Sequence, residues 1–168
     1  MKNVMFDIET LGTRPTSVIV QIGACYFNRN TGEVDREFSV NIEPDDRFTQ
    51  DQSTLDWWAA QSQEAKDAVF TGGIKLEEAL AEFAIFLKDC EYLWSHATFD
   101  APILSNAYAV LGMKMPVPYR GLRDIRTLMD LSNTSALKVA REGIHHNALD
   151  DAKTQVAYCY PAFKRLQK

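Results

Sequence analysis

The chain has 168 residues, 46% of them hydrophobic, which is enough for one domain with a full core and too few for two. Its formal net charge of −5 argues against a broad basic surface for duplex nucleic acid. A cleft whose acids surround divalent cations is compatible with the same charge, because each cation locally cancels two negative charges. No apolar run approaches the roughly 18 residues that a membrane span needs.

The three cysteines are widely spaced and odd in number, at Cys25, Cys90 and Cys159. They fit no zinc or redox pattern and favour a reducing compartment. The chain opens without a charged and apolar leader, and its first strand is expected to begin at residue 2 or 3. We therefore expect a cytoplasmic protein with a single domain over residues 1–168.

Apolar and alternating runs predict strands first and then helices mixed with short strands. The expected strands cover residues 2–9, 18–27, 34–42, 92–95 and 120–123, and the first three form an antiparallel meander. The expected helices cover residues 55–61 after a cap at Ser53 or Thr54, 63–70 after Ser62, 74–88, 101–111, 125–131 after Asp124, 135–142, and a last helix from Asn147. This order predicts an α/β sheet with helices on its faces.

The first candidate site lies in "VMFDIETLG", where Asp7 and Glu9 end the first strand. Residues two apart in a strand share a face and lie about 6.6 Å apart along the chain. Two carboxylates at that separation repel and raise each other's pKa. Divalent cations such as Mg²⁺ remove this problem because they take oxygen ligands. A solvated strand end is the alternative interpretation of this motif alone.

Two further acidic motifs follow at greater distance along the chain. Asp100 in "WSHATFDAPIL" stands just before a helix, where an N-cap is the alternative interpretation. The stretch "HHNALDDA" at residues 145–152 opens the last helix, where acids also suit the helix dipole. The dipole does not explain the two adjacent histidines.

In order and spacing, the three motifs resemble those of the DnaQ-like DEDDh exonuclease superfamily, within the ribonuclease-H-like fold. The resemblance spans residues 4–152. The matching residues are Asp7 and Glu9 in the first motif, Asp100 at the end of "ATFD" in the second, and His146, Ala148 and Asp151 in the third.

The resemblance implies a mixed five-stranded sheet and a metal-dependent 3′-5′ exonuclease. Asp7, Glu9, Asp100 and Asp151 would hold two divalent cations, Mg²⁺ or Mn²⁺, with Asp7 bridging both. His146 would be the general base, a role that suits an unperturbed pKa of about 6.5. The substrate would be a single-stranded 3′ end and the product a nucleoside 5′-monophosphate. Relatives are often dimers, so a homodimer is one expectation.

Two points stay open within this resemblance. By chemistry alone, His145 and Asp150 could replace their neighbours, and only the family spacing selects His146 and Asp151. Many members carry His-Asn-Ala ahead of the second motif, where this chain has Ser-His-Ala at residues 95–97. His96 therefore either contacts substrate or packs.

Two stretches outside the metal motifs, "LDWWAAQSQEA" and "RDIRTL", resemble the bacteriophage branch that includes mycobacterial 3′-5′ exoribonucleases. Trp57 and Trp58 lie about 100° apart on a helix. One can pack in the core while the other stacks on a terminal base, and core packing of both is the alternative. Asp124 and Arg126 are expected to cap and brace their helix rather than touch substrate.

The remaining substrate contacts are implied by the resemblance. The terminal nucleotide would lie beside Thr10, Leu11 and Gly12, with Leu11 wedged against the base, and Phe99 is a candidate for sugar packing. Arg14, Lys138 and Arg141 are candidates for phosphate contact. RNA is preferred because the resemblance to phage-type and mycobacterial relatives points that way, and single-stranded DNA is the alternative. A non-catalytic nucleic-acid-binding module is disfavoured because every motif residue is present.

Overall fold

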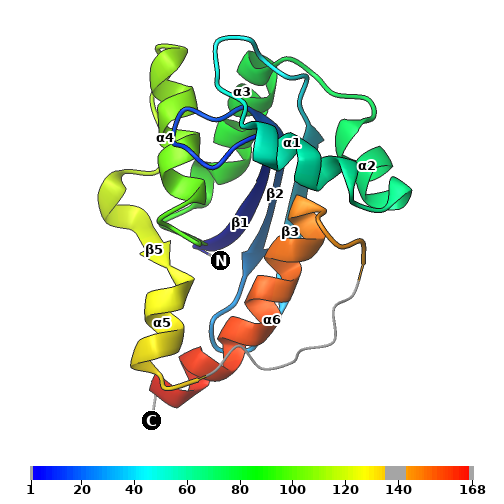
Figure 1. The fold of residues 1–168 in the computed structure, drawn as a ribbon. Helices are drawn as coiled ribbons and strands as arrows, with labels where there is room; N and C mark the ends of the chain where they lie inside the picture. The colour runs from blue at the N-terminus through cyan, green and yellow to red at the C-terminus, as the bar shows by residue number, and fades with distance from the viewer. Residues whose placement is uncertain (1, 135–142, 167–168) are drawn as a thin grey trace.

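A computed structural model describes residues 2–134 and 143–166 of the chain (Figure 1). Its strands form a five-stranded sheet in the order β3-β2-β1-β4-β5. β2 is antiparallel to both β1 and β3, whereas β4 is parallel to β1 and β5, so the predicted mixed sheet is confirmed. The strands are β1 (Asn3–Thr10), β2 (Ile19–Phe27), β3 (Val34–Asn41), β4 (Tyr92–Ser95) and β5 (Leu122–Asp124).

Along the chain, the helices of the described residues occur in the predicted order, three between β3 and β4, one between β4 and β5, and two after β5. They are α1 (Gln52–Ala59), α2 (Gln63–Phe70), α3 (Leu76–Phe86), α4 (Asp100–Val110), α5 (Ile125–Leu131) and α6 (Ala148–Leu166), with 3₁₀ turns at Leu87–Asp89 and Tyr119–Gly121. None of the helices in these ranges is long and apolar enough to cross a membrane. The helix expected over residues 135–142 lies outside the described residues.

The predicted helix caps are only partly confirmed. The side chains of Ser62 and Asp124 accept hydrogen bonds from the first turns of α2 and α5, as expected. The expected cap of α1 is wrong, because Ser53 and Thr54 lie inside the helix and Asp51 precedes it. The Asp51 carboxylate does not cap α1 either, and instead accepts a hydrogen bond from the backbone N–H of Thr13 at 3.0 Å.

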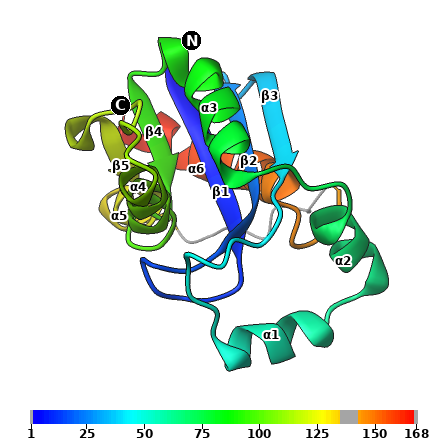
Figure 2. The same ribbon diagram turned by 90° about the horizontal axis from the view of Figure 1, so that it is seen from above.

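The sheet separates two apolar cores, and β1 contributes to both. Phe6 and Ile8 lie in the core beneath α3 and α4, whereas Met5 lies in the core beneath α5 and α6. Figure 2 shows α3 and α6 on opposite faces of β1 and β2, while α1 and α2 lie beyond the end of the sheet. Because strand residues alternate between faces, Asp7 and Glu9 continue the face on which Met5 and α6 lie.

The N-terminus of α6 is held directly against β2. Gly23 pairs with Asp7 in the β1–β2 register, and a Cβ atom at Gly23 would overlap the backbone of Ala148 and Leu149. The buried Gln21 side chain accepts a hydrogen bond from the backbone N–H of Ala148 at 2.7 Å. A glycine is thus required here for the close approach, which brings the first turns of α6 over the end of β1.

We expect Gly23→Ala to destabilise the protein by about 1–3 kcal/mol, because the added methyl group meets backbone that cannot rotate away. Urea unfolding at neutral pH measures the change. Ser39→Thr is the matched control, since Ser39 pairs with Gly23 on β3 but is exposed. The control should stay within about 0.5 kcal/mol of the parent protein. Equal stability of the two variants would show that α6 is not held by this contact.

Candidate active site

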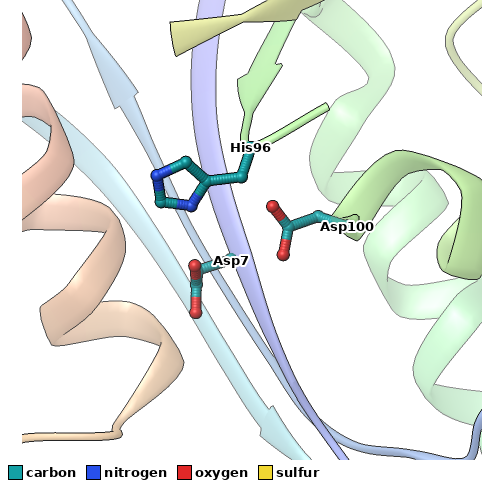
Figure 3. A group of neighbouring side chains, drawn as sticks. All are labelled: Asp7, His96 and Asp100. Carbon is teal, nitrogen blue, oxygen red and sulfur yellow. The ribbon is translucent and has the colours of Figure 1, made fainter. Parts of the chain in front are cut away.

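Asp7, His96 and Asp100 form the first cluster of polar side chains. One ligand atom from each lies within 4.8 Å of the others. Figure 3 shows them converging from β1, from the loop after β4 and from the start of α4. The parallel pairing of β1 with β4 explains this meeting, because both strands end at the same edge of the sheet.

A second cluster joins Glu9, His146 and Asp151 within the same distance limit of 4.8 Å. Glu9 is buried at the end of β1, His146 precedes α6, and Asp151 lies in the first turn of α6. The charges of Glu9 and Asp151 act on Asp7, so the two clusters adjoin. The structure therefore brings together the five residues selected from the three motifs. It also adds His96, which meets Asp7 and Asp100.

The electrostatics of the first cluster fit a bound cation. Burial raises the pKa of Asp7 well above its usual range, and the charge of Asp100 raises it further. Burial likewise raises the pKa of Asp100 to about 7. Asp100 is 2% exposed, and its Oδ2 atom has no hydrogen-bond partner among the described residues. An oxygen-rich set with a buried acceptor is the kind that Mg²⁺ and Mn²⁺ prefer.

Gln155 orients Asp7, and sequence reasoning missed it. Its side-chain amide Nε2 donates a hydrogen bond of 2.7 Å to Asp7 Oδ1, and it is buried on α6. This bond favours the ionised carboxylate and lowers the pKa of Asp7, against the larger effect of burial. The spacing offered a signal, because Gln155 follows Asp151 by one helical turn and shares its face.

Asp150, which the motif left as an alternative to Asp151, positions the segment that carries His145 and His146. The Asp150 carboxylate accepts a hydrogen bond from the backbone N–H of Ile144 at 2.8 Å, so it holds the chain just before the histidines. His146 adopts a left-handed backbone conformation, with φ of 63°. This places the His146 ring against Trp57, with centroids 4.6 Å apart and planes at 81°. His145 is exposed.

A cavity of about 370 Å³ opens beside Glu9 and contains most of the predicted substrate contacts. Trp58 is 4% exposed and donates a hydrogen bond from Nε1 to the Thr10 carbonyl at 2.9 Å, whereas Trp57 is 42% exposed. Trp58 therefore packs inside while Trp57 is partly exposed, which is one of the two arrangements left open by the sequence. The cavity is lined by Ile8, Glu9, Thr10, Gly12, Thr13, Ser53, Thr54, Trp57, Trp58 and Phe99.

Two of the predicted contacts, Leu11 and Arg14, differ from expectation, whereas Gly12 does not. Leu11 is buried in the core and does not line the cavity, so the expected wedge against a base is wrong in this structure. Gly12 does line the cavity, but a Cβ there would press on Ser17 and Asp51. Arg14 points its guanidinium toward Asp51, 3.7 Å away. The two other basic candidates, Lys138 and Arg141, lie outside the described residues.

His96 lies between the acids and a tyrosine. Its Nε2 atom is 3.3 Å from the hydroxyl of Tyr158 on α6. Burial lowers the pKa of His96 to about 4, with a further contribution from the charge of Arg126. At neutral pH the His96 ring is therefore uncharged, and its unprotonated nitrogen can accept a hydrogen bond or coordinate a cation.

A family model for the 3′-5′ exoribonuclease Rv2179c-like domain matches residues 2–162. No curated protein sequence matches the chain.

Solved structures show the same fold at low identity. E. coli exonuclease I in complex with a dT13 oligonucleotide is 16% identical with a TM-score of 0.70 over 98% of this chain, which spans 41% of that protein. The nuclease domain of 3′hExo, a DEDDh family member bound to rAMP, is 16% identical with a TM-score of 0.67, over 98% of this chain and 91% of that domain. A 3′-exonuclease that recognises the histone mRNA stem-loop is 15% identical with a TM-score of 0.70, over 96% of this chain and 63% of that one.

The raised pKa of Asp100 predicts a pH-dependent stability when chelator is present. The folded protein retains a proton that the unfolded chain releases above about pH 4, so the free energy of unfolding falls as the pH rises towards 7. Asp100→Asn removes this titration. We expect the variant to be more stable than the parent at pH 8 by about 1–3 kcal/mol, with a smaller difference at pH 5.

Urea unfolding at the two pH values in chelator measures this difference. Asp130→Asn is the control, because Asp130 is an exposed carboxyl on α5 and its replacement should change stability by less than about 0.5 kcal/mol. An Asp100→Asn variant that is less stable than the parent at pH 8 would contradict the claim that burial of the ionised Asp100 carboxylate destabilises the folded protein.

Proposed function

Since the chain belongs to the family of 3′-5′ exoribonuclease Rv2179c-like domains, we propose that it removes nucleotides one at a time from single-stranded 3′ ends and releases nucleoside 5′-monophosphates. The observation that carries the proposal is the meeting of Asp7, Glu9, Asp100, His146 and Asp151 at one edge of the sheet. Hydrolysis of a phosphodiester needs an activated water molecule and stabilisation of the negative charge that develops in the transition state, and this set of groups can provide both.

Four carboxylates would hold two divalent cations, Mg²⁺ or Mn²⁺, namely Asp7, Glu9, Asp100 and Asp151. Such cations stabilise the negative charge that develops on the phosphoryl oxygens and on the leaving 3′ oxygen. The support is the buried, unpartnered Oδ2 of Asp100 together with the raised pKa of Asp7 and of Asp100.

His146 is the proposed general base. It accepts the proton of the water that attacks phosphorus, while the bond between phosphorus and the 3′ oxygen of the preceding nucleotide breaks. Trp57 contacts its ring and the Asp150 carboxylate fixes the chain ahead of it. Both contacts restrict where the imidazole can point, which keeps the base aligned with the water.

The cavity beside Glu9 is the proposed site of the terminal nucleotide. The exposed ring of Trp57 offers a stacking surface worth about 1–3 kcal/mol for a base. Thr10 and Gly12 bring backbone to the same cavity, and Phe99 brings an aromatic edge. No lysine or arginine lines it among the described residues, so binding there depends on stacking rather than on charge.

RNA is the proposed substrate class, and single-stranded DNA is the alternative. The family description supports RNA. Ser53 and Thr54 also line the cavity, and hydroxyl side chains can form hydrogen bonds with a 2′-hydroxyl, which only RNA carries.

Digestion of oligonucleotides labelled at the 5′ end tests the polarity and the metal requirement. We expect a ladder shortened from the 3′ end in Mg²⁺ or Mn²⁺, faster for RNA than for DNA of the same sequence, and no digestion in chelator. Asp7→Asn should abolish digestion. Activity that persists in chelator would refute the proposal. Immediate release of the labelled mononucleotide without a ladder would also refute it, because it would show digestion from the 5′ end.

His146→Asn tests the general base without disturbing the backbone, because asparagine tolerates the left-handed conformation found at this position. We expect kcat to fall by about 10²–10⁴-fold, as for loss of a general base, with KM changed far less. His145→Asn is the matched control and should retain most of the activity. If the control loses activity and His146→Asn retains it, the base has been assigned to the wrong histidine.

A further inference from the structure

A second cavity lies next to the cluster of Asp7, His96 and Asp100. Its volume is about 280 Å³, and it is lined by His96, Ile125, Arg126, Met129 and Tyr158. His96 also belongs to the cluster with Asp7 and Asp100, whereas the larger cavity shares Glu9 with the other cluster. The two cavities therefore adjoin different ends of one row of acidic groups.

Arg126, which was expected to brace its helix, is the charged residue of this second cavity. Its guanidinium is exposed, and its hydrogen bond to the Thr98 hydroxyl is long, at 3.5 Å. No carboxylate in the described parts of the chain forms an ion pair with it. Its positive charge nevertheless acts on Asp100 and His96, so it lies near the reacting centre.

The remaining lining suits a nucleoside. Tyr158 and His96 present two rings joined through the tyrosine hydroxyl, and Ile125 and Met129 form an apolar floor. Aromatic and apolar surfaces with one exposed guanidinium match the chemistry of a base and sugar that carry a phosphate. The larger cavity has aromatic rings but no lysine or arginine in the described chain, so the two cavities are chemically distinct.

We propose that this second cavity binds the penultimate nucleotide of the substrate, with Arg126 contacting the phosphate on its 5′ side. The proposal rests on the proposed exonuclease function. A strand whose last nucleotide lies beside Trp57 and whose scissile phosphate lies at the acids must continue past Asp100 and His96. The second cavity is the next site along that path.

Two dinucleotides that differ in one group test this assignment, namely pApA, which carries the 5′ phosphate, and ApA, which lacks it. We expect the parent protein to cleave pApA with a kcat/KM about 10–100-fold higher than ApA, the usual range for a charged hydrogen bond of about 1.5–3 kcal/mol. Arg126→Gln should remove most of this preference, because kcat/KM should fall much further for pApA than for ApA. Arg126→Lys should restore part of it.

Arg123→Gln is the matched control, because it removes one positive charge from the same segment. The Arg123 guanidinium stacks on Tyr92, donates to the Arg120 and Leu122 carbonyls, and does not line the cavity. The control should keep the parent preference for pApA. A preference that survives Arg126→Gln, or that Arg123→Gln abolishes equally, would overturn the assignment.

A binding measurement separates this inference from the proposed reaction. Fluorescence competition of pApA and ApA is run on Asp7→Asn protein, with Arg126 intact or replaced by Gln. Tighter binding of pApA that depends on Arg126 supports the site even if neither dinucleotide is cleaved, in which case the proposed reaction fails alone. Equal binding of the two dinucleotides overturns the site, whether or not cleavage occurs.

Discussion

The structure depends on an electrostatic constraint, the gathering of four carboxylates at the end of one central strand. Burial and the charges of Asp100, Glu9 and Asp151 all raise the pKa of Asp7, so the folded chain holds these groups at a cost. Hydrogen bonds act against this cost at two of the acids, from Gln155 to Asp7 and from backbone groups of Ile8, His96 and Asp100 to Asp100. The positive charge of Arg126 also lowers the pKa of Asp100. A folded protein keeps such an arrangement where positive charge from a bound ion completes it.

Strands and helices, rather than loops, hold these carboxylates in place. The parallel pairing of β1 with β4 brings Asp7 and Asp100 to one edge, and the contact of α6 with Gly23 fixes Asp151 above them. Apolar cores on both faces of the sheet hold these elements in place. Groups that are fixed before a substrate arrives need little reorganisation during the reaction, which is how charged sites stabilise transition states.

The strands could be predicted from the sequence because alternation within a strand is a local signal. The meeting of the motif residues was implied by the resemblance of their order and spacing to a known superfamily. The sequence did not predict contacts that depend on which distant elements touch. The Asp51 carboxylate accepts a hydrogen bond from Thr13, 38 residues away, and Asp51 rather than the expected Ser53 or Thr54 precedes α1. Leu11 was misassigned because its motif neighbours line the cavity while its own side chain turns into the core. The contact of Trp57 with His146 likewise joins two segments far apart in the chain.

Binding of Mn²⁺ followed by electron paramagnetic resonance tests the central claim most directly, because it detects the ion without requiring catalysis. We predict that the parent protein binds Mn²⁺, that Asp7→Asn and Asp100→Asn each weaken binding at least tenfold, and that Asp150→Asn, whose carboxylate holds the Ile144 backbone instead, binds like the parent. Equal Mn²⁺ affinity in the parent protein and in Asp7→Asn would contradict the claim that these acids form the cation site.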